Sequence, residues 1–171
     1  MVSSLAALSN AGQAASYYEA DDYYAKGGLG PSLGLGEGAK LLGQSGEVDR
    51  TAFASLLEGQ IPDGHQLGTM RDGDRQHRPG WDITLSAPKS VSIMALVAGD
   101  ERLMAAHRSA VKTTMAFVEK HMAATTLREG DSVVRQTTGN LAIASFQHRT
   151  SRAQDPQLHS HNVILNMTRD A

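Results

Sequence analysis

The sequence of 171 residues contains no cysteine, and this absence excludes disulfide scaffolds, thiol catalysis, iron–sulfur clusters and cysteine-based zinc sites. Aromatic residues make up only 5% of the chain, and no apolar run approaches the ~20 residues that a membrane-spanning helix needs. The start of the sequence also lacks the basic region and the long apolar core of a secretion signal. We therefore expect a protein of the cytoplasm, without membrane insertion, whose metal ligands would be histidine, aspartate or glutamate.

Hydrophobic residues make up 40% and charged residues 20% of the chain, which is typical of a globular protein. A chain of this length buries roughly 70% of the surface that it exposes when unfolded, so one domain with its own core is expected. Charge is divided unevenly, because residues 1–70 have three basic and eight acidic residues whereas residues 71–171 have thirteen and ten. The second part is therefore the better candidate for contact with a polyanion.

Four segments carry the capping residues and the apolar period of helices. They are residues 11–18 capped by Ser9 or Asn10, residues 50–58 capped by Asp49, a helix with Ser86 as N-cap and Pro88 in its first turn that reaches Val97, and a long helix from about Asp100 to Ala124. The long helix should bury an apolar stripe of Met104, Val111, Met115, Val118 and Met122. The glycine-rich residues 27–38 are expected to be a mobile loop, and they lack the preceding strand and the Gly-Lys-Ser/Thr sequence of a phosphate-binding loop.

Three segments, residues 81–85, 140–148 and 159–166, are expected to be strands. Alternation in the first strand places Asp82 and Thr84 on the face opposite Trp81, Ile83 and Leu85. The polar residues 149–158 between the other two strands predict a long hairpin loop or a crossover, and antiparallel strands favour the hairpin.

The strongest chemical pattern consists of His148, His159 and His161. Residues i and i+2 of a strand project from one face about 7 Å apart, so His159 and His161 can reach one ion, and an antiparallel hairpin would bring His148 beside them. Three imidazoles on a rigid sheet with open coordination positions are typical of a catalytic metal centre. A His-x-His pair alone is more simply a polar face, and it is the third histidine that favours the metal site. Asp82 is expected to accept a hydrogen bond from a ligating histidine, with a turn or cap carboxylate as the alternative.

All four tyrosines lie within eight residues, as the pairs Tyr17–Tyr18 and Tyr23–Tyr24. Core packing does not predict such a concentration beside acidic residues, although two of the four could pack against the sheet. A phenol oxygen is a nucleophile when a base or a metal lowers its pKa from about 10. Combined with a metal centre that stabilises charge on a phosphodiester, these tyrosines indicate a transesterase.

Several motifs in order resemble the MobF-type conjugative relaxases, the TrwC/TraI-like proteins. The signature segment is RPGWDITLSAPKSVS at residues 78–92, and the others are LVAGD at 96–100, TGNL at 138–141, DPQLHSH at 155–161 and the tyrosine block. The resemblance extends from about Ser9 to Thr168. It implies an α+β fold, the relaxase palm of HUH-endonuclease type, in which an antiparallel sheet is flanked by helices.

The resemblance also implies an activity, namely site- and strand-specific DNA nicking and strand transfer at a plasmid origin of transfer during bacterial conjugation. The implied cofactor is a divalent metal ion, Mg²⁺ or Mn²⁺, although imidazole ligands favour ions such as Zn²⁺ on affinity grounds. The implied partners are single-stranded or hairpin plasmid DNA, accessory relaxosome proteins and the coupling protein of a type IV secretion system. Members of the family are transferred into the recipient cell.

The resemblance assigns roles to individual residues. Tyr17 would attack the scissile phosphate and form a 5′-phosphotyrosyl intermediate, and Tyr23 would act in a second strand transfer. Because the segment between the pairs is short, Tyr18 and Tyr24 are alternatives. The metal ligands would be His148, His159 and His161, with Asp82 as the carboxylate beside one of them. From their place near the predicted site, Lys89, Arg149 and Arg152 are candidates for contacts with DNA phosphates, as is Arg78, and a solvated face is the alternative. His107 and His121 are expected to be solvated or hydrogen-bonded outside the site. His65 and His77 are expected to be surface residues of polar loops, with a contact to a DNA phosphate as the alternative.

Relaxase domains of this family extend further than this sequence and usually precede a helicase domain. Residues 1–171 are therefore expected to be the N-terminal portion of a single relaxase domain, with the C-terminal part of the domain missing and no helicase domain. Two alternatives stay open at this point. One is a tri-histidine metal-dependent hydrolase in which the tyrosines only pack or orient, and the other is an inactive DNA-binding fragment.

Overall fold

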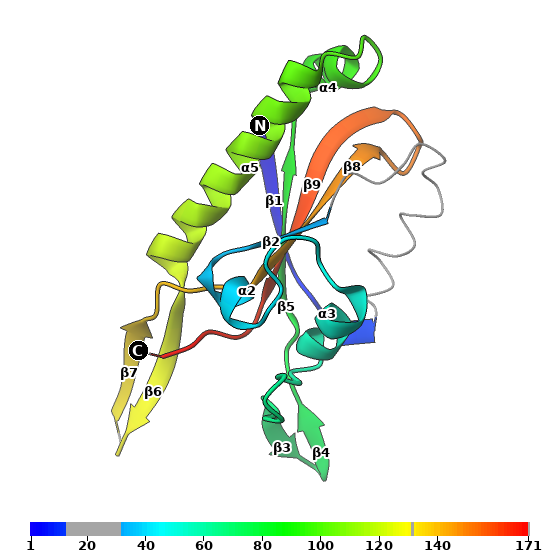
Figure 1. The fold of residues 1–171 in the computed structure, drawn as a ribbon. Coiled ribbons are helices and arrows are strands. Elements are labelled where there is room, and N and C mark those ends of the chain that lie inside the picture. The colour runs from blue at the N-terminus through cyan, green and yellow to red at the C-terminus, as the bar shows by residue number, and fades with distance from the viewer. Residues whose placement is uncertain (13–31, 131, 171) are drawn as a thin grey trace.

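The computed structural model describes residues 1–12, 32–130 and 132–170. Its centre is a five-stranded sheet in the order β1-β5-β9-β8-β2, and every neighbouring pair is antiparallel (Figure 1). The strands are β1 (Val2–Ala7), β2 (Ser32–Leu35), β5 (Gly80–Ser86), β8 (Ile143–Thr150) and β9 (Pro156–Leu165). The expected α+β class, with an antiparallel sheet flanked by helices, is confirmed.

All three predicted strands are present with changed ends, and the longest of them, β9, lies in the middle of the sheet. β8 begins at Ile143 rather than Asn140, and β9 begins at Pro156, three residues before His159. Pro156 can begin a strand because a first residue need not donate to the ladder. The connection is consequently the short turn 151–155, in which the N–H of Ser151 donates to the carbonyl of Asp155 at 2.9 Å. β8 and β9 therefore form a hairpin, and the crossover is excluded.

The two faces of the sheet are covered by different helices. Helix α5 (Glu101–Met122) packs on one face, where the core cluster consists of Leu85, Val111, Met115, Ile143 and Ile164. Helix α3 (Arg50–Leu57) packs on the other face, with a cluster of Val48, Phe53, Leu56, Leu57, Ala142, Ala144, Phe146, Val163 and Leu165. His148, His159 and His161 continue this second face beyond the residues that α3 covers, because side chains alternate along each strand.

Helix α5 begins as predicted, with the side chain of Asp100 accepting a hydrogen bond from the N–H of Arg102. Its buried residues are Met104, His107, Val111 and Met115. The prediction for the last turn was wrong, because the core cluster beneath the helix ends at Val118 and the Met122 side chain is 64% exposed. The cap of α3 is also as predicted, since Asp49 accepts from the N–H of Ala52 at 2.9 Å.

Helix α4 (Lys89–Leu96) corrects the predicted N-cap. Ser86 is not the cap, because it is still paired with His159 in the β5–β9 ladder. The N-cap is Pro88, which has extended backbone angles, and the hydroxyl of Ser92 donates to its carbonyl at 3.2 Å.

The glycine-rich segment was wrongly predicted to be a loop throughout, at least over its described part. Residues 32–35 form β2 at the sheet edge, and α2 (Glu37–Leu41) follows directly. Gly34 allows this close packing, because a Cβ atom there would lie 1.6 Å from the carbonyl oxygen of Gln44. The glycines of this segment therefore permit tight contact between backbone segments.

Two exposed hairpins were not predicted. They are β3 (Thr69–Arg71) with β4 (Asp74–Gln76), and β6 (Ala124–Glu129) with β7 (Ser132–Thr137), as Figure 1 shows. The predicted helix at residues 11–18 lies largely outside the described residues. Among the residues that are described, no helix combines the length and the apolar character needed to cross a membrane.

Candidate metal centre

Three histidines from two adjacent strands meet on the face of the sheet that α3 leaves open. His159 and His161 belong to β9, and His148 of β8 is the cross-strand partner of His159. Their ring centroids are 5.0 to 5.2 Å apart, and one ligand atom from each lies within 4.8 Å of the others. All three side chains are buried. The hairpin thus brings together the three residues that the sequence pattern singled out.

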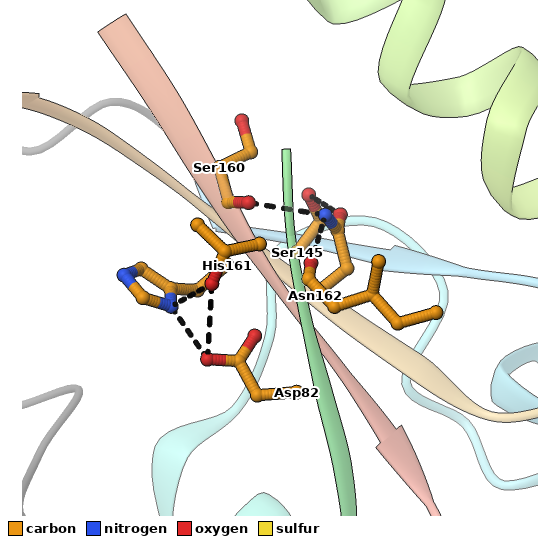
Figure 2. A network of polar contacts seen from close by, with 7 residues as sticks. Asp82, Ser145, Ser160, His161 and Asn162 are labelled. Carbon is orange, nitrogen blue, oxygen red and sulfur yellow. Dashed lines mark hydrogen bonds and ion pairs between the residues drawn. The ribbon is translucent and has the colours of Figure 1, made fainter. Parts of the chain in front are cut away.

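A buried carboxylate from the neighbouring strand β5 contacts one of these histidines. The Oδ2 atom of Asp82 lies 2.6 Å from Nδ1 of His161, as Figure 2 shows. The hydroxyl oxygen of Thr84 lies 3.1 Å from the same nitrogen and 3.4 Å from Oδ2 of Asp82. Thr84 was not named as a site residue from the sequence, although strand alternation places it on the same face as Asp82.

Hydrogen bonds made by Nδ1 determine which ring nitrogen of two of the histidines is left for a metal ion. Nδ1 of His159 lies 3.1 Å from the carbonyl oxygen of Gln157, which can only accept, so this nitrogen carries the proton. Nδ1 of His161 likewise donates to the Asp82 carboxylate. In a neutral ring that has its proton on Nδ1, the lone pair lies on Nε2, and this atom can coordinate a cation. Three imidazoles with a carboxylate behind one of them are a donor set suited to a divalent metal ion.

The opposite face of β9 carries a second set of polar side chains. The hydroxyl of Ser160 lies 3.0 Å from Nε2 of His107 on α5, and Asn162 is completely buried between β5 and β8. Burial lowers the pKa of His107 to about 4, and the nearby His159 and Arg108 add to this effect. His107 was expected to be solvated or hydrogen-bonded, and it is hydrogen-bonded and buried. The gap between Met104 and Val111 in the apolar stripe was the signal for its burial.

The predicted DNA-contacting cations fall at two ends of the sheet. Lys89 donates from Nζ to the carbonyl of Pro156 at 3.2 Å, and Arg149 and Arg152 are exposed on or beside the β8–β9 turn, so these three lie at the histidine end. Arg78 precedes β5 at its other end and lines a separate cavity of about 610 Å³. Seven strand residues span roughly 20 Å, so Arg78 is not brought together with the other three.

Tyr17, Tyr18, Tyr23 and Tyr24 lie outside the described residues. Their role as nucleophiles that attack the phosphorus therefore stays a prediction, which rests on the sequence pattern and the resemblance.

Comparison with protein families decides the membership of this chain. The family model named "TrwC relaxase" matches residues 11–171. The chain belongs to the TrwC relaxase family. It is 47% identical over 166 residues to the multifunctional conjugation protein TraI of Escherichia coli, and this match covers 96% of the chain but 9% of TraI.

Solved structures of TrwC give the same result for the fold. The metal-bound structure of the conjugative relaxase TrwC in complex with oriT DNA matches with a TM-score of 0.85 and 45% identity, over 99% of this chain and 58% of the TrwC chain. A TrwC complex with a 27-mer DNA comprising the recognition hairpin and the cleavage site matches with a TM-score of 0.83 and 41% identity. This match covers 99% of this chain and 57% of the TrwC chain. The chain thus spans somewhat more than half of the TrwC chain and a small part of TraI.

Proposed function

We propose that this chain nicks one strand of plasmid DNA at an origin of transfer and that it rejoins or transfers this strand during bacterial conjugation. The observation that carries the proposal is the cluster of His148, His159 and His161 with Asp82 held against His161, in a chain of the TrwC relaxase family. Residues 1–171 would then form the N-terminal portion of a single relaxase domain. The tri-histidine hydrolase loses support, because the family match covers the tyrosine block together with the histidines.

The reaction would be a transesterification with Tyr17 as the nucleophile. Its phenol oxygen forms a bond to the scissile phosphorus and loses a proton, while the bond from phosphorus to the 3′ oxygen breaks and that oxygen gains a proton. One phosphodiester is exchanged for another, so no ATP is needed and the reverse reaction rejoins the strand. Tyr23 would carry out the second transfer, with Tyr18 and Tyr24 as the alternatives within each pair.

The metal ligands would be His148, His159 and His161, and the ion would be Mg²⁺ or Mn²⁺. A bound divalent ion would supply positive charge next to the nonbridging oxygens of the phosphate. The protein's own contribution is orientation, because Asp82 and the carbonyl of Gln157 hold two imidazoles with Nε2 toward the centre. Since imidazoles bind Zn²⁺ and Cu²⁺ more tightly than Mg²⁺ whichever ion works in the reaction, the rate of nicking measured with each ion decides the identity of the working ion.

The DNA substrate would be single-stranded or extruded hairpin DNA, as in the TrwC complexes with oriT DNA. Lys89, Arg149 and Arg152 at the histidine end would contact its phosphates, and Arg78 would contact DNA further along the sheet. The site of action would be the bacterial cytoplasm, with transfer into the recipient cell. Accessory relaxosome proteins and a type IV coupling protein would be the further partners.

The deciding experiment uses a single-stranded oligonucleotide from the plasmid's own transfer origin. The oligonucleotide is labelled at its 3′ end, because that fragment keeps the tyrosine linkage, and it is incubated with Mg²⁺ or Mn²⁺. We expect a covalent adduct on a denaturing gel that is lost in Tyr17→Phe. Absence of an adduct at saturating DNA and metal would contradict the proposal, and hydrolysis that survives Tyr17→Phe would instead support the hydrolase.

A second experiment separates the metal site from DNA binding. His159→Ala should lower nicking far more than affinity for DNA, because a ligand acts at one phosphate whereas DNA contacts are spread over a wider surface. An equal loss of nicking and of binding would count against the assignment of His159.

A further inference from the structure

Asn162 is the most completely buried polar side chain next to the metal centre, and it points away from that centre. It lies between His161 and Val163 on β9, with no exposed surface, on the face that α5 covers. The core cluster on that face includes the apolar residues Leu85, Ile143 and Ile164. Packing alone favours an apolar side chain here, because burying an amide costs free energy unless every polar atom has a partner.

Every hydrogen-bonding group of the Asn162 amide has a partner on the sheet. Nδ2 donates to the carbonyl of Ile83 at 2.8 Å and to the carbonyl of Ser160 at 3.1 Å, and Oδ1 accepts from the hydroxyl of Ser145 at 2.8 Å. Two partners are carbonyls, which only accept, so the orientation of the amide is fixed. Ile83 and Ser145 are also the cross-strand neighbours of Asn162 on β5 and β8. This one side chain therefore connects the three central strands (Figure 2).

The bond to Ile83 bears directly on the contact at the metal centre. Ile83 is the residue between Asp82 and Thr84, and both of these contact Nδ1 of His161 on the other face of the sheet. His161 in turn directly precedes Asn162. The Asn162–Ile83 bond thus holds the two backbone segments whose side chains form the 2.6 Å contact between Asp82 and His161. If this bond is lost, β5 can shift relative to β9, and the carboxylate moves away from the imidazole.

We propose that Asn162 is a positioning residue of the metal centre, which sets the Asp82–His161 contact from the reverse face of the sheet. This inference rests on the proposed metal site and goes beyond it, because Asn162 touches neither the ion nor the DNA. Carboxylate partners of metal-bound histidines typically change metal affinity by about 10- to 100-fold when they are lost, and displacement of Asp82 should have an effect in this range.

The test compares Asn162→Leu with the wild-type chain and with Ile164→Val as the matched control. Leucine has nearly the shape of asparagine and suits the apolar face, and Ile164 lies on the same strand and the same face but makes no side-chain hydrogen bond. The Kd for Mn²⁺ is measured by competition with a fluorescent chelator, and the unfolding midpoint is measured in EDTA. We expect Asn162→Leu to raise the Kd about 10- to 100-fold and Ile164→Val to leave it within twofold.

A second measurement is made without metal. A short hydrogen bond to a carboxylate shifts the Nδ1–H proton resonance of a histidine downfield, and this signal is assigned to His161 by its loss in Asp82→Asn. In Asn162→Leu the signal should move or disappear, and in Ile164→Val it should stay. If Asn162→Leu does not fold, Asn162→Thr suits a strand and keeps only one donor, and the same two readouts apply.

The outcomes separate the inference from the proposed function. An unchanged Kd and an unchanged His161 signal in folded Asn162→Leu would overturn the positioning role. If His159→Ala abolished Mn²⁺ binding in the same experiment, the metal centre would stand and only the role of Asn162 would be rejected. A wild-type chain that bound no divalent ion would reject the metal centre, and the inference with it.

Discussion

Asp82 and His161 lie 79 positions apart in the sequence, and their side chains meet with 2.6 Å between Oδ2 and Nδ1. The contact joins two adjacent strands on the face that carries the candidate metal-ligating histidines. It fixes the ring of His161 through Nδ1 and leaves Nε2 as the candidate ligand atom. The relationship gives the first prediction.

Asp82→Asn should raise the Kd for Mn²⁺ about 10- to 100-fold, because the amide keeps the shape of the carboxylate and loses its charge. The matched control is Asp155→Asn, the same change at an exposed residue of the β8–β9 turn, which should leave the Kd within twofold. Competition with a fluorescent chelator measures both. Equal Kd values for the two variants would show that Asp82 does not support the ligand.

The free energy of unfolding should depend on pH through His107. Its pKa is about 4 in the folded chain and near 6.5 when unfolded, so the unfolded chain takes up the proton first as pH falls. The contribution of His107 to the free energy of unfolding is fully present above about pH 6.5. It is lost progressively as the pH falls toward 4, by up to about 3 kcal/mol. Urea unfolding in EDTA at pH 7 and pH 4.5 should therefore show a smaller pH effect in His107→Gln than in the wild type. The variant His121→Gln, at an exposed position, should lose as much free energy of unfolding between pH 7 and pH 4.5 as the wild type. An equal loss in His107→Gln would contradict the prediction.

Gly38→Ala should destabilise the chain although Gly38 lies within helix α2. Alanine is intrinsically better than glycine in a helix by about 1 kcal/mol, but a Cβ at this position would lie 2.6 Å from the carbonyl carbon of Leu141. Backbone atoms cannot move aside cheaply, so we expect a net loss of about 1–3 kcal/mol in urea unfolding. Gly12→Ala is the control, because the nearest atom of the described residues would be 3.8 Å away. A stabilised Gly38→Ala variant would show that α2 does not pack closely on Leu141.

The cations at the histidine end should contribute to the salt dependence of DNA binding. Replacing Lys89, Arg149 and Arg152 together by glutamine should lower the slope of log K against log salt for single-stranded DNA by about 2, at roughly 0.7 per phosphate contact. Fluorescence anisotropy at several salt concentrations measures this slope. Arg102→Gln, on the opposite face and paired with Asp100, should leave it unchanged. An unchanged slope in the triple variant would show that these three cations do not contact DNA phosphates.

The face that carries the histidine cluster was predictable because the patterns that place its side chains are local. A period of two in the strands sets the face of Asp82, His159 and His161, and an antiparallel hairpin leaves one register in which His148 opposes His159. The caps Asp49 and Asp100 were predictable for the same reason, since each accepts a hydrogen bond from an N–H only two or three residues ahead.

The features that were missed depend on residues distant in the sequence. β2 pairs with β8 at the sheet edge while Gly34 lets the segment around Gln44 approach closely, and Asn162 is buried because both neighbouring strands offer it partners. His107 was expected to be solvated or hydrogen-bonded outside the site, and Ser160 on β9 is the partner that makes its burial tolerable. Strand and helix periods do not specify which distant groups will satisfy a buried polar atom.

The five-residue turn between β8 and β9 has a consequence for the order in which the centre assembles. Closing so short a connection costs little chain entropy, and an isolated hairpin of this kind forms within about 1–10 μs. All three imidazoles lie on this hairpin. Asp82 is 79 positions before His161, and it reaches the imidazole only when β5 has paired with β9. We therefore expect the nascent hairpin to acquire the imidazole cluster before the carboxylate, so that a cation captured early would favour the correct strand register during the slower, non-local steps of folding.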